Sequence, residues 1–306
     1  MRCRRGPPCA PTTCCSPKTG PSPQLFSPST DVDDQDPSSV VRDGDPDRFL
    51  STLYAPAEKR DALFALGAFY VEVAAIRDRV REPLPGEIRL QWWRDAIETR
   101  QAGGHPLAEK LIAIITGYDL PTAAFEQLLE ARIFDLYADP MPGRTELEAY
   151  CGETEGAILQ LACLVLDRQA ARSASEASGH GACALGIARI LARLPRDRAR
   201  GQCFVPRDLL AAAGTDPESF VAARDEPAAQ RAVTALVALA TEHMTRFEAA
   251  AAKLPTTQRS AFLPLAALPL RLDRLGDAGK VLDGSAGEPP AWRRQWRIFR
   301  RASSGW

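Results

Sequence analysis

The chain has 306 residues, of which 45% are hydrophobic and 25% are charged, values typical of a globular protein. Its formal net charge is −1, so nothing global attracts it to nucleic acid, and no nucleic-acid partner is expected. No apolar run reaches the roughly 18 residues needed to span a bilayer, which argues against a transmembrane protein.

Residues 1–46 differ in composition from the rest of the chain. They hold nine of the 25 prolines and show almost no apolar periodicity. Such a segment buries too little surface to offset the entropy of ordering it, which predicts disorder over 1–46 and a folded domain over 47–306. The first thirty residues are basic and contain no Asp or Glu. A targeting segment, a disordered tail and a stretch upstream of the true start all stay open.

From residue 47 onward, apolar residues recur with the 3.6-residue period of an α-helix, and period-two alternation is nearly absent. Pro56, followed by Ala-Glu-Lys-Arg, predicts a helix with proline in its first turn. This pattern predicts an all-α fold, a single helical bundle with no sheet. The predicted helices cover 63–82, 86–101, 107–116, 122–137, 145–166, 174–194 and 226–253. The second of these is expected to turn Ile88, Trp92, Trp93 and Ala96 inward.

The cysteines and histidines predict no metal centre and no catalytic triad. Four cysteines lie in the first fifteen residues without the paired spacing of a zinc site: Cys3, Cys9, Cys14 and Cys15. The other four are scattered through helical sequence and are expected to be buried free thiols: Cys151, Cys163, Cys183 and Cys203. The three histidines, His105, His180 and His243, are far apart in sequence.

Four motifs occur in the order and spacing of the squalene/phytoene synthase family. The first covers 56–70 and ends at Ile76-Arg77-Asp78, and a tryptophan-rich helix follows at 86–94. The third is Tyr150-Cys151 with Gly156, and the fourth runs from 184 to 193 and continues through 200–206. The chain resembles this family over most of residues 47–280. The resemblance implies a single all-helical fold of the isoprenoid-synthase type with a central cavity.

Enzymes of this family join two prenyl diphosphates head to head and hold Mg²⁺ between aspartates on two facing helices. Magnesium neutralises the departing diphosphate while each ion is bound by one or two carboxylates. The resemblance assigns the catalytic and metal-binding positions to Asp78 and Asp197, and a cavity-lining catalytic role to Tyr150. Arg60 matches a basic position near the first motif and is a candidate for ligand binding, together with Arg189 and Arg193. For Arg60, an exposed helix start is the alternative.

The chain departs from the family at the acidic positions. Ala74 and Ala75 stand where the first motif carries its other acids, and Arg193 stands at the leading position of the second. Arg189 falls on the family's asparagine, and Pro195 biases Leu194 away from helical geometry. The usual cluster of three magnesium ions is therefore not expected.

Two interpretations of the remaining acids stay open. In the first, they are structural: Asp78 pairs with Arg77, Arg81 or Arg89, and Asp197 forms a solvated ion pair with its arginine neighbours. In the second, one Mg²⁺ lies between the two aspartates, or Arg189 and Arg193 bind an anion directly through their planar guanidinium groups. Glu153 or Glu155 is expected to face one of these arginines across the cavity.

The C-terminal segment carries Trp292, Trp296 and Phe299 on one helical face, among several arginines. This pattern fits a helix lying on an anionic membrane, and it also fits a terminal helix packed on the bundle. A peripheral contact with a membrane through these three residues is one expectation.

The run 64–78 is similar to the branch of the family that contains the mitochondrial assembly factor of respiratory complex I. The resemblance implies an atypical or non-catalytic protein that binds an isoprenoid or other lipid, or assists complex assembly at the membrane. The alternatives are an active Mg²⁺-dependent prenyltransferase making phytoene or squalene, and a helical adaptor with a filled cavity. The expected location is cytoplasmic, or peripheral on the inner membrane (mitochondrial in a eukaryote). The sequence names no protein partner.

Overall fold

The structure, a computed structural model, describes residues 36–306, and its regular elements over this range are all helical. Predictions for residues 1–35 fall outside the described residues. The helices are α1 (Pro37–Gly44), α2 (Pro46–Leu53), α3 (Ala57–Arg79), α4 (Pro83–Thr99), α5 (Pro106–Gly117), α6 (Thr122–Ala131), α7 (Arg144–Cys151), α8 (Ala157–Leu166), α9 (Ser175–Ala199), α10 (Arg207–Ala212), α11 (Pro217–Val221), α12 (Glu226–Ala251), α13 (Arg259–Phe262), α14 (Leu268–Leu275), α15 (Ala278–Asp283) and α16 (Ala291–Ser304).

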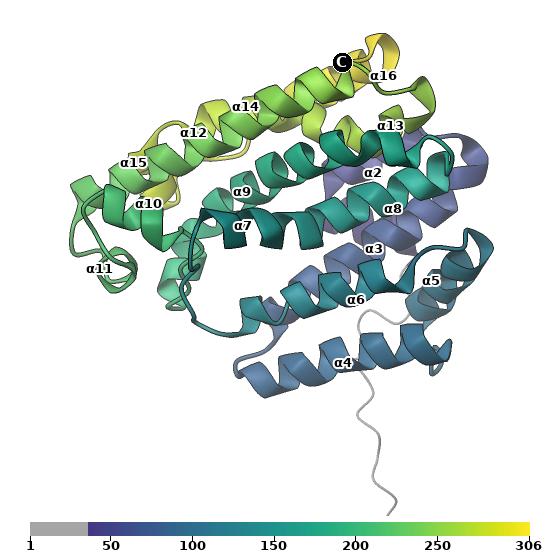
Figure 1. Cartoon of the computed structure of the whole chain (residues 1–306), viewed down its shortest axis with the longest axis horizontal. Helices are drawn as coiled ribbons and strands as arrows, with labels where there is room; N and C mark the ends of the chain where they lie inside the picture. Colours follow the sequence, from purple (N-terminus) through teal and green to yellow (C-terminus); the bar gives the residue numbers. More distant parts are fainter. Residues whose placement is uncertain (1–35) are drawn as a thin grey trace, which may run out of the picture.

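The helices are stacked in tiers (Figure 1). Helices α12 and α14 form the upper tier, α9 lies beneath them, and α7, α8, α3, α6 and α4 follow below. Helix α9 packs against α12, and α3 packs against α1, α5 and α8. Every residue of 62–70 in α3 is buried, as expected for a helix enclosed on all sides. The core therefore surrounds α3 and α9, the two helices that carry the predicted acidic positions.

The predicted boundary at residue 46 is wrong for the residues just before it, because α1 is a helix. Asp36-Pro37 and Asp45-Pro46 each place an acidic residue before a proline, which suits the first turn of a helix. Val41 is fully buried and lies so close to α3 that a Cβ on Gly67 would come within 2.9 Å of it. The burial of apolar side chains such as Val41 offsets the conformational entropy lost when this proline-containing segment is ordered.

Helix α9 runs through Pro195 to Ala199, so the expected break at Leu194 is wrong. An interior proline removes one backbone hydrogen bond and usually bends or ends a helix. Here Leu194 is buried in the core, and Arg193 and Arg196, on either side of the proline, pair with Asp78 of α3. Arg193 and Asp197 are consequently one helical turn apart on the same face.

Two other predicted helices differ in detail. Ile88 in α4 is exposed, because the buried face of α4 runs through Leu90, Trp93 and Ile97. The predicted helix 145–166 exists, but a turn of π-helix at Gly152–Gly156 separates α7 from α8. The predicted buried free thiols at Cys151, Cys163, Cys183 and Cys203 are confirmed. In the described part of the chain, no helix has the length and apolarity needed to cross a membrane.

Candidate functional site

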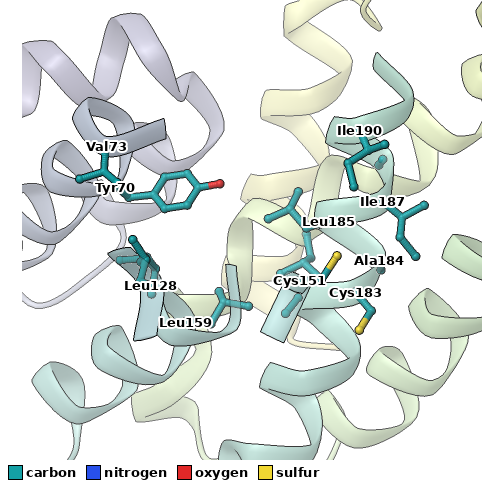
Figure 2. Close-up of a cluster of buried hydrophobic side chains, with 14 of the residues drawn as sticks. Tyr70, Val73, Leu128, Cys151, Leu159, Cys183, Ala184, Leu185, Ile187 and Ile190 are labelled. Carbon is teal, nitrogen blue, oxygen red and sulfur yellow. The ribbon is translucent and has the colours of Figure 1, made fainter. Parts of the chain in front are cut away.

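A cavity of about 280 Å³ lies between α3, α9 and the π-helical turn. Its volume is near the lower end of the roughly 300–1,000 Å³ found for small-molecule sites. Figure 2 shows Tyr70 extending from α3 with its hydroxyl toward the helix that carries Leu185 and Ile190. The charged and aromatic side chains that line the cavity are Tyr70, Arg77, Arg132, Asp135, Tyr150, Glu155, Arg189, Arg193, Asp197, Arg200 and Phe204.

The π-helical turn places Glu155 inside the protein. The glycines at both ends of the turn, Gly152 and Gly156, are weak helix formers. The Thr154 hydroxyl donates a 2.6 Å hydrogen bond to the Tyr150 carbonyl and so satisfies a backbone acceptor within the distorted turn. π-Helical turns inside α-helices occur often at functional sites. Glu155 is consequently almost fully buried beside the cavity.

Glu155 belongs to a buried charge network with Asp45, Arg48 and Arg189. Arg48 donates to Asp45 at 3.0 Å and to Glu155 at 3.2 Å. Arg189 donates to Asp45 at 2.6 Å and lies 3.0 Å from Glu155. The expected pairing of a glutamate of this segment with Arg189 is therefore confirmed. Burial acts to raise the pKa of Asp45, but the charges of Arg189 and Arg48 outweigh it and hold that pKa below its ordinary value.

Tyr70 is enclosed by this network. Its hydroxyl donates to Glu155, and the guanidinium groups of Arg48, Arg132 and Arg189 lie 5.1, 5.2 and 5.4 Å from its ring centroid. Burial, together with the negative charge of Glu155, raises the pKa of Tyr70 to about 12. Tyr70 therefore stays neutral at physiological pH, and arginines contact its aromatic faces.

Tyr150 lines the cavity as predicted, but its hydroxyl is already engaged. It donates to Asp135 at 2.7 Å and accepts from Arg132 at 2.9 Å, while Arg132 also donates to Asp135 at 3.0 Å. Burial raises the pKa of Tyr150 well above its ordinary value. This closed triangle of hydrogen bonds fixes the Tyr150 ring at the cavity wall.

Asp78 is bound by three arginines. Two of them lie in α9, and the third is the residue that directly follows α9. Arg193 donates to its carboxylate at 3.0 Å, Arg196 at 2.9 Å and Arg200 at 2.6 Å. We refer to these four residues as the Asp78 cluster. Its partners differ from the predicted Arg77, Arg81 and Arg89, because the continuation of α9 past Pro195 brings more distant arginines to α3. Burial opposes ionisation of Asp78, yet these arginines keep its pKa below the ordinary value.

Asp197 lines the same cavity from α9 but differs from Asp78 in its contacts. The predicted solvated ion pair is not found, because the side chain is only 7% exposed. Among residues 36–306, its carboxylate forms no hydrogen bond or ion pair. Burial outweighs the attraction of Arg193 and raises the pKa of Asp197 to about 6.

These residues do not fit a magnesium site. Magnesium needs several oxygen ligands that are free to face one ion, and both oxygens of Asp78 accept hydrogen bonds from arginine. Arg193 and Arg200 place positive charge between Asp78 and the cavity that Asp197 lines. Within the described range, no group of three or more His, Cys, Asp or Glu side chains is arranged to hold a metal ion.

Arg60 lies apart from this cavity. Its Nε donates to the Ala55 carbonyl at 2.9 Å, which fastens the start of α3, and it borders a different hollow near Thr256. Of the predicted site residues, the structure thus brings Tyr150, Arg189, Arg193 and Asp197 to one cavity, with Asp78 bound to its arginines.

The sequence did not single out several residues that build the site. The Asp-Pro pair at Asp45 was a usable signal, because it marks a helix start that positions both Asp45 and Arg48. Arg77, Arg132 and Arg200 carry no local signal of this kind. The structure also brings two distant histidines together, with His180 Nδ1 3.1 Å from His243 Nδ1 between α9 and α12.

The chain is similar to known proteins in both sequence and fold. The family model for squalene/phytoene synthase matches residues 41–300. One relative is the Mus musculus protein NADH dehydrogenase (ubiquinone) complex I, assembly factor 6. It is 27% identical to this chain over 232 residues, which cover 75% of this chain and 69% of that protein. Phytoene synthase from Rhodobacter capsulatus is 24% identical over 190 residues, 60% of this chain and 55% of that protein.

The fold is also similar to that of a solved dehydrosqualene synthase in complex with a ligand. The TM-score is 0.70 at 15% identity, and the match covers 88% of this chain and 94% of that one. The predicted all-helical fold of the isoprenoid-synthase type is confirmed by this similarity.

Proposed function

Because the chain belongs to the squalene/phytoene synthase family, matching it over residues 41–300, we propose that it is a non-catalytic member of that family. The observation that supports this proposal is the Asp78 cluster. Three guanidinium groups bind the carboxylate at which the family resemblance implies magnesium. A fourth guanidinium group, that of the half-buried Arg189, also lines the cavity and pairs with the carboxylates of Asp45 and Glu155. Positive charge is thus supplied by the protein itself.

A role that suits this arrangement is the binding of a phosphate-bearing lipid without metal. Arg77 lines the cavity and, within the described residues, has no carboxylate partner. Guanidinium groups bind phosphate oxygens in pairs of parallel hydrogen bonds, which makes arginine well suited to this ligand. Arg77 would contact the phosphate, and the apolar part of the cavity wall would contact the start of the lipid chain.

Similarity to assembly factors supports a further part of the proposal, namely that the protein assists the assembly of respiratory complex I. The mouse relative carries this role in its name. The corresponding location is beside the membrane that houses complex I, which in a eukaryote is the inner mitochondrial membrane. Deleting the gene in its own host should lower complex I activity and leave isoprenoid content unchanged. Normal complex I activity would exclude this role.

The first prediction concerns turnover. The purified chain, incubated with labelled farnesyl or geranylgeranyl diphosphate and Mg²⁺, should form no squalene or phytoene. Three arginines occupy the Asp78 carboxylate, and Asp197 alone is too few ligands to hold the ion against the diphosphate. A dehydrosqualene synthase assayed in parallel serves as the positive control. The alternative, an active prenyltransferase, is favoured by the uncommitted carboxylate of Asp197 in the cavity. Magnesium-dependent turnover that disappears in Asp78→Ala would establish that alternative.

The second prediction concerns ligand binding. Farnesyl diphosphate should bind with the same affinity in Mg²⁺ and in EDTA, measured by calorimetry. Replacing Arg77 by Gln should weaken binding about tenfold, because one charge-assisted hydrogen bond contributes roughly 1.5–3 kcal/mol. Arg81→Gln removes an exposed arginine that does not line the cavity and is the matched control. Binding that requires Mg²⁺, or equal losses in both variants, would contradict metal-free recognition.

A further inference from the structure

Helix α16 presents three large aromatic side chains to solvent. Trp292, Trp296 and Phe299 are 64%, 57% and 47% exposed, and the rings of Trp296 and Phe299 lie 5.7 Å apart. Their spacing of four and three residues places them on one face of the helix. Tryptophan side chains are mostly buried in folded proteins, because exposing them to water is unfavourable. A contiguous exposed aromatic face therefore indicates a binding surface.

Arginines lie along one flank of this face. Helix α16 contains five arginines and no acidic residue. Arg294 and Arg301 turn inward, where they pair with Asp47 and Glu248. The other three, Arg293, Arg297 and Arg300, form no ion pair with any described residue. At 100° per residue they stand side by side next to the aromatic face.

The opposite side of α16 fixes the direction in which this surface points. Ile298 is fully buried against Leu263 and Ala266, and the inward arginine pairs hold both ends of the helix to the bundle. The exposed face is therefore the outward side of a helix whose opposite side is anchored to the bundle. Helix α16 contributes no acidic side chain to this face.

We propose that this face, defined by Trp292, Trp296, Phe299, Arg293, Arg297 and Arg300, binds the surface of an anionic membrane. Helices of this composition lie in the plane of the interface, with aromatic rings at the boundary of headgroups and acyl chains. The arginines remain at the level of the lipid phosphates, where anionic headgroups supply the charge that α16 lacks. A nucleic-acid duplex would satisfy the arginines but offers no apolar phase for three aromatic side chains. This inference goes beyond the proposed function and holds whether or not the cavity binds a lipid.

Vesicle sedimentation with the full chain tests the proposal. The protein should bind vesicles of phosphatidylglycerol and phosphatidylcholine, bind less as salt is added, and not bind vesicles of phosphatidylcholine alone. One arginine near an anionic surface changes affinity about fivefold, so the triple variant Arg293→Gln/Arg297→Gln/Arg300→Gln should bind roughly 100-fold more weakly. Arg81→Gln/Arg100→Gln/Arg224→Gln removes the same charge from exposed positions far from α16 and should bind as the parent does.

The aromatic residues are tested separately. Trp292→Ser/Trp296→Ser/Phe299→Ser should lose binding at least tenfold, and Leu84→Ser/Ile88→Ser, exposed apolar positions on α4, should lose none. Brominated lipid should quench tryptophan fluorescence in the parent but not in the aromatic variant, whose remaining tryptophans are buried or half-buried. Circular dichroism checks that each variant is folded.

Three outcomes would overturn the proposal. These are equal binding to neutral and anionic vesicles, equal losses in the α16 variants and their controls, and tighter binding of a nucleic-acid duplex than of vesicles through the same arginines. The proposal is supported only if brominated lipid quenches the parent protein and if both α16 variants, but not their controls, lose vesicle binding.

Discussion

Asp197 shows how burial can change the chemistry of a carboxylate. Its side chain is 7% exposed, and its pKa is raised to about 6 because burial disfavours the charged form more than Arg193 and Arg200 favour it. A raised pKa means that the folded protein binds a proton more tightly than the unfolded chain does. Ionisation of Asp197 therefore lowers stability, and this loss develops as pH rises from about 4 to about 6.

Replacing Asp197 by Asn should stabilise the protein at neutral pH. Asn resembles the protonated acid and removes the cost of ionisation. Raising the pKa of Asp197 from 3.8 to about 6 corresponds to a cost of roughly 2–3 kcal/mol at neutral pH. Urea unfolding of both proteins should give similar free energies near pH 4 and a growing advantage for Asn up to about pH 7. Asp273→Asn, at an exposed position of α14, controls for the loss of one negative charge. A constant difference across this range would show that Asp197 is already ionised without cost.

Helix α9 is the element on which the site depends, and its approach to α7 requires a glycine. A Cβ at Gly186 would lie 2.6 Å from the Cys151 sulfur, well inside contact distance. Glycine inside a helix costs about 0.5–1 kcal/mol relative to alanine, so close packing explains its presence here. The same helix carries Gly179 at an exposed position where no heavy atom lies within 4 Å of the added Cβ.

These two glycines should respond in opposite directions to alanine. Gly186→Ala should destabilise by roughly 1–3 kcal/mol, because α9 must move away from Cys151. Gly179→Ala should stabilise by about 0.5–1 kcal/mol, because it only improves helix propensity. Chemical denaturation measures both. If the two variants changed stability in the same direction, the close contact would not constrain the helix.

Over the whole molecule, the N-terminal helices close one side of the site. Asp45, between α1 and α2, pairs with Arg48 and with Arg189 of α9. Val40 and Val41 of α1 are buried against the rest of the bundle. The first described residues therefore form part of the same core as the cavity, although their composition resembles that of a linker.

A chain beginning at Pro46 should be less stable than one beginning at Asp36 by at least about 3 kcal/mol. It lacks two buried valines, each contributing roughly 1.5–3 kcal/mol, and leaves the buried Arg48 and the half-buried Arg189 without Asp45. Urea unfolding of the two chains measures the difference. Val41→Ala and Asp45→Asn in the longer chain separate the apolar part from the charged part. Equal stability of the two chains would show that α1 is dispensable.

The sequence by itself determined the helical class, most helix positions, the family resemblance and the cavity-lining residues Tyr150, Arg189 and Arg193. Helical periodicity and the four ordered motifs are local properties, so they can be detected along the chain. The sequence also showed that the acidic positions were depleted, which argued against the usual metal cluster before any contact was known.

Only the tertiary structure decided which charges meet. Asp78 and Arg200 are separated by 122 residues, and Asp45 and Arg189 by 144. Local sequence showed neither pairing. The first depends on the continuation of α9 through Pro195, and the second depends on the packing of α1 and α2 against the core. Burial decided the rest: it separates Asp197, unpaired and hard to ionise, from Asp78, which is ionised and bound by arginines.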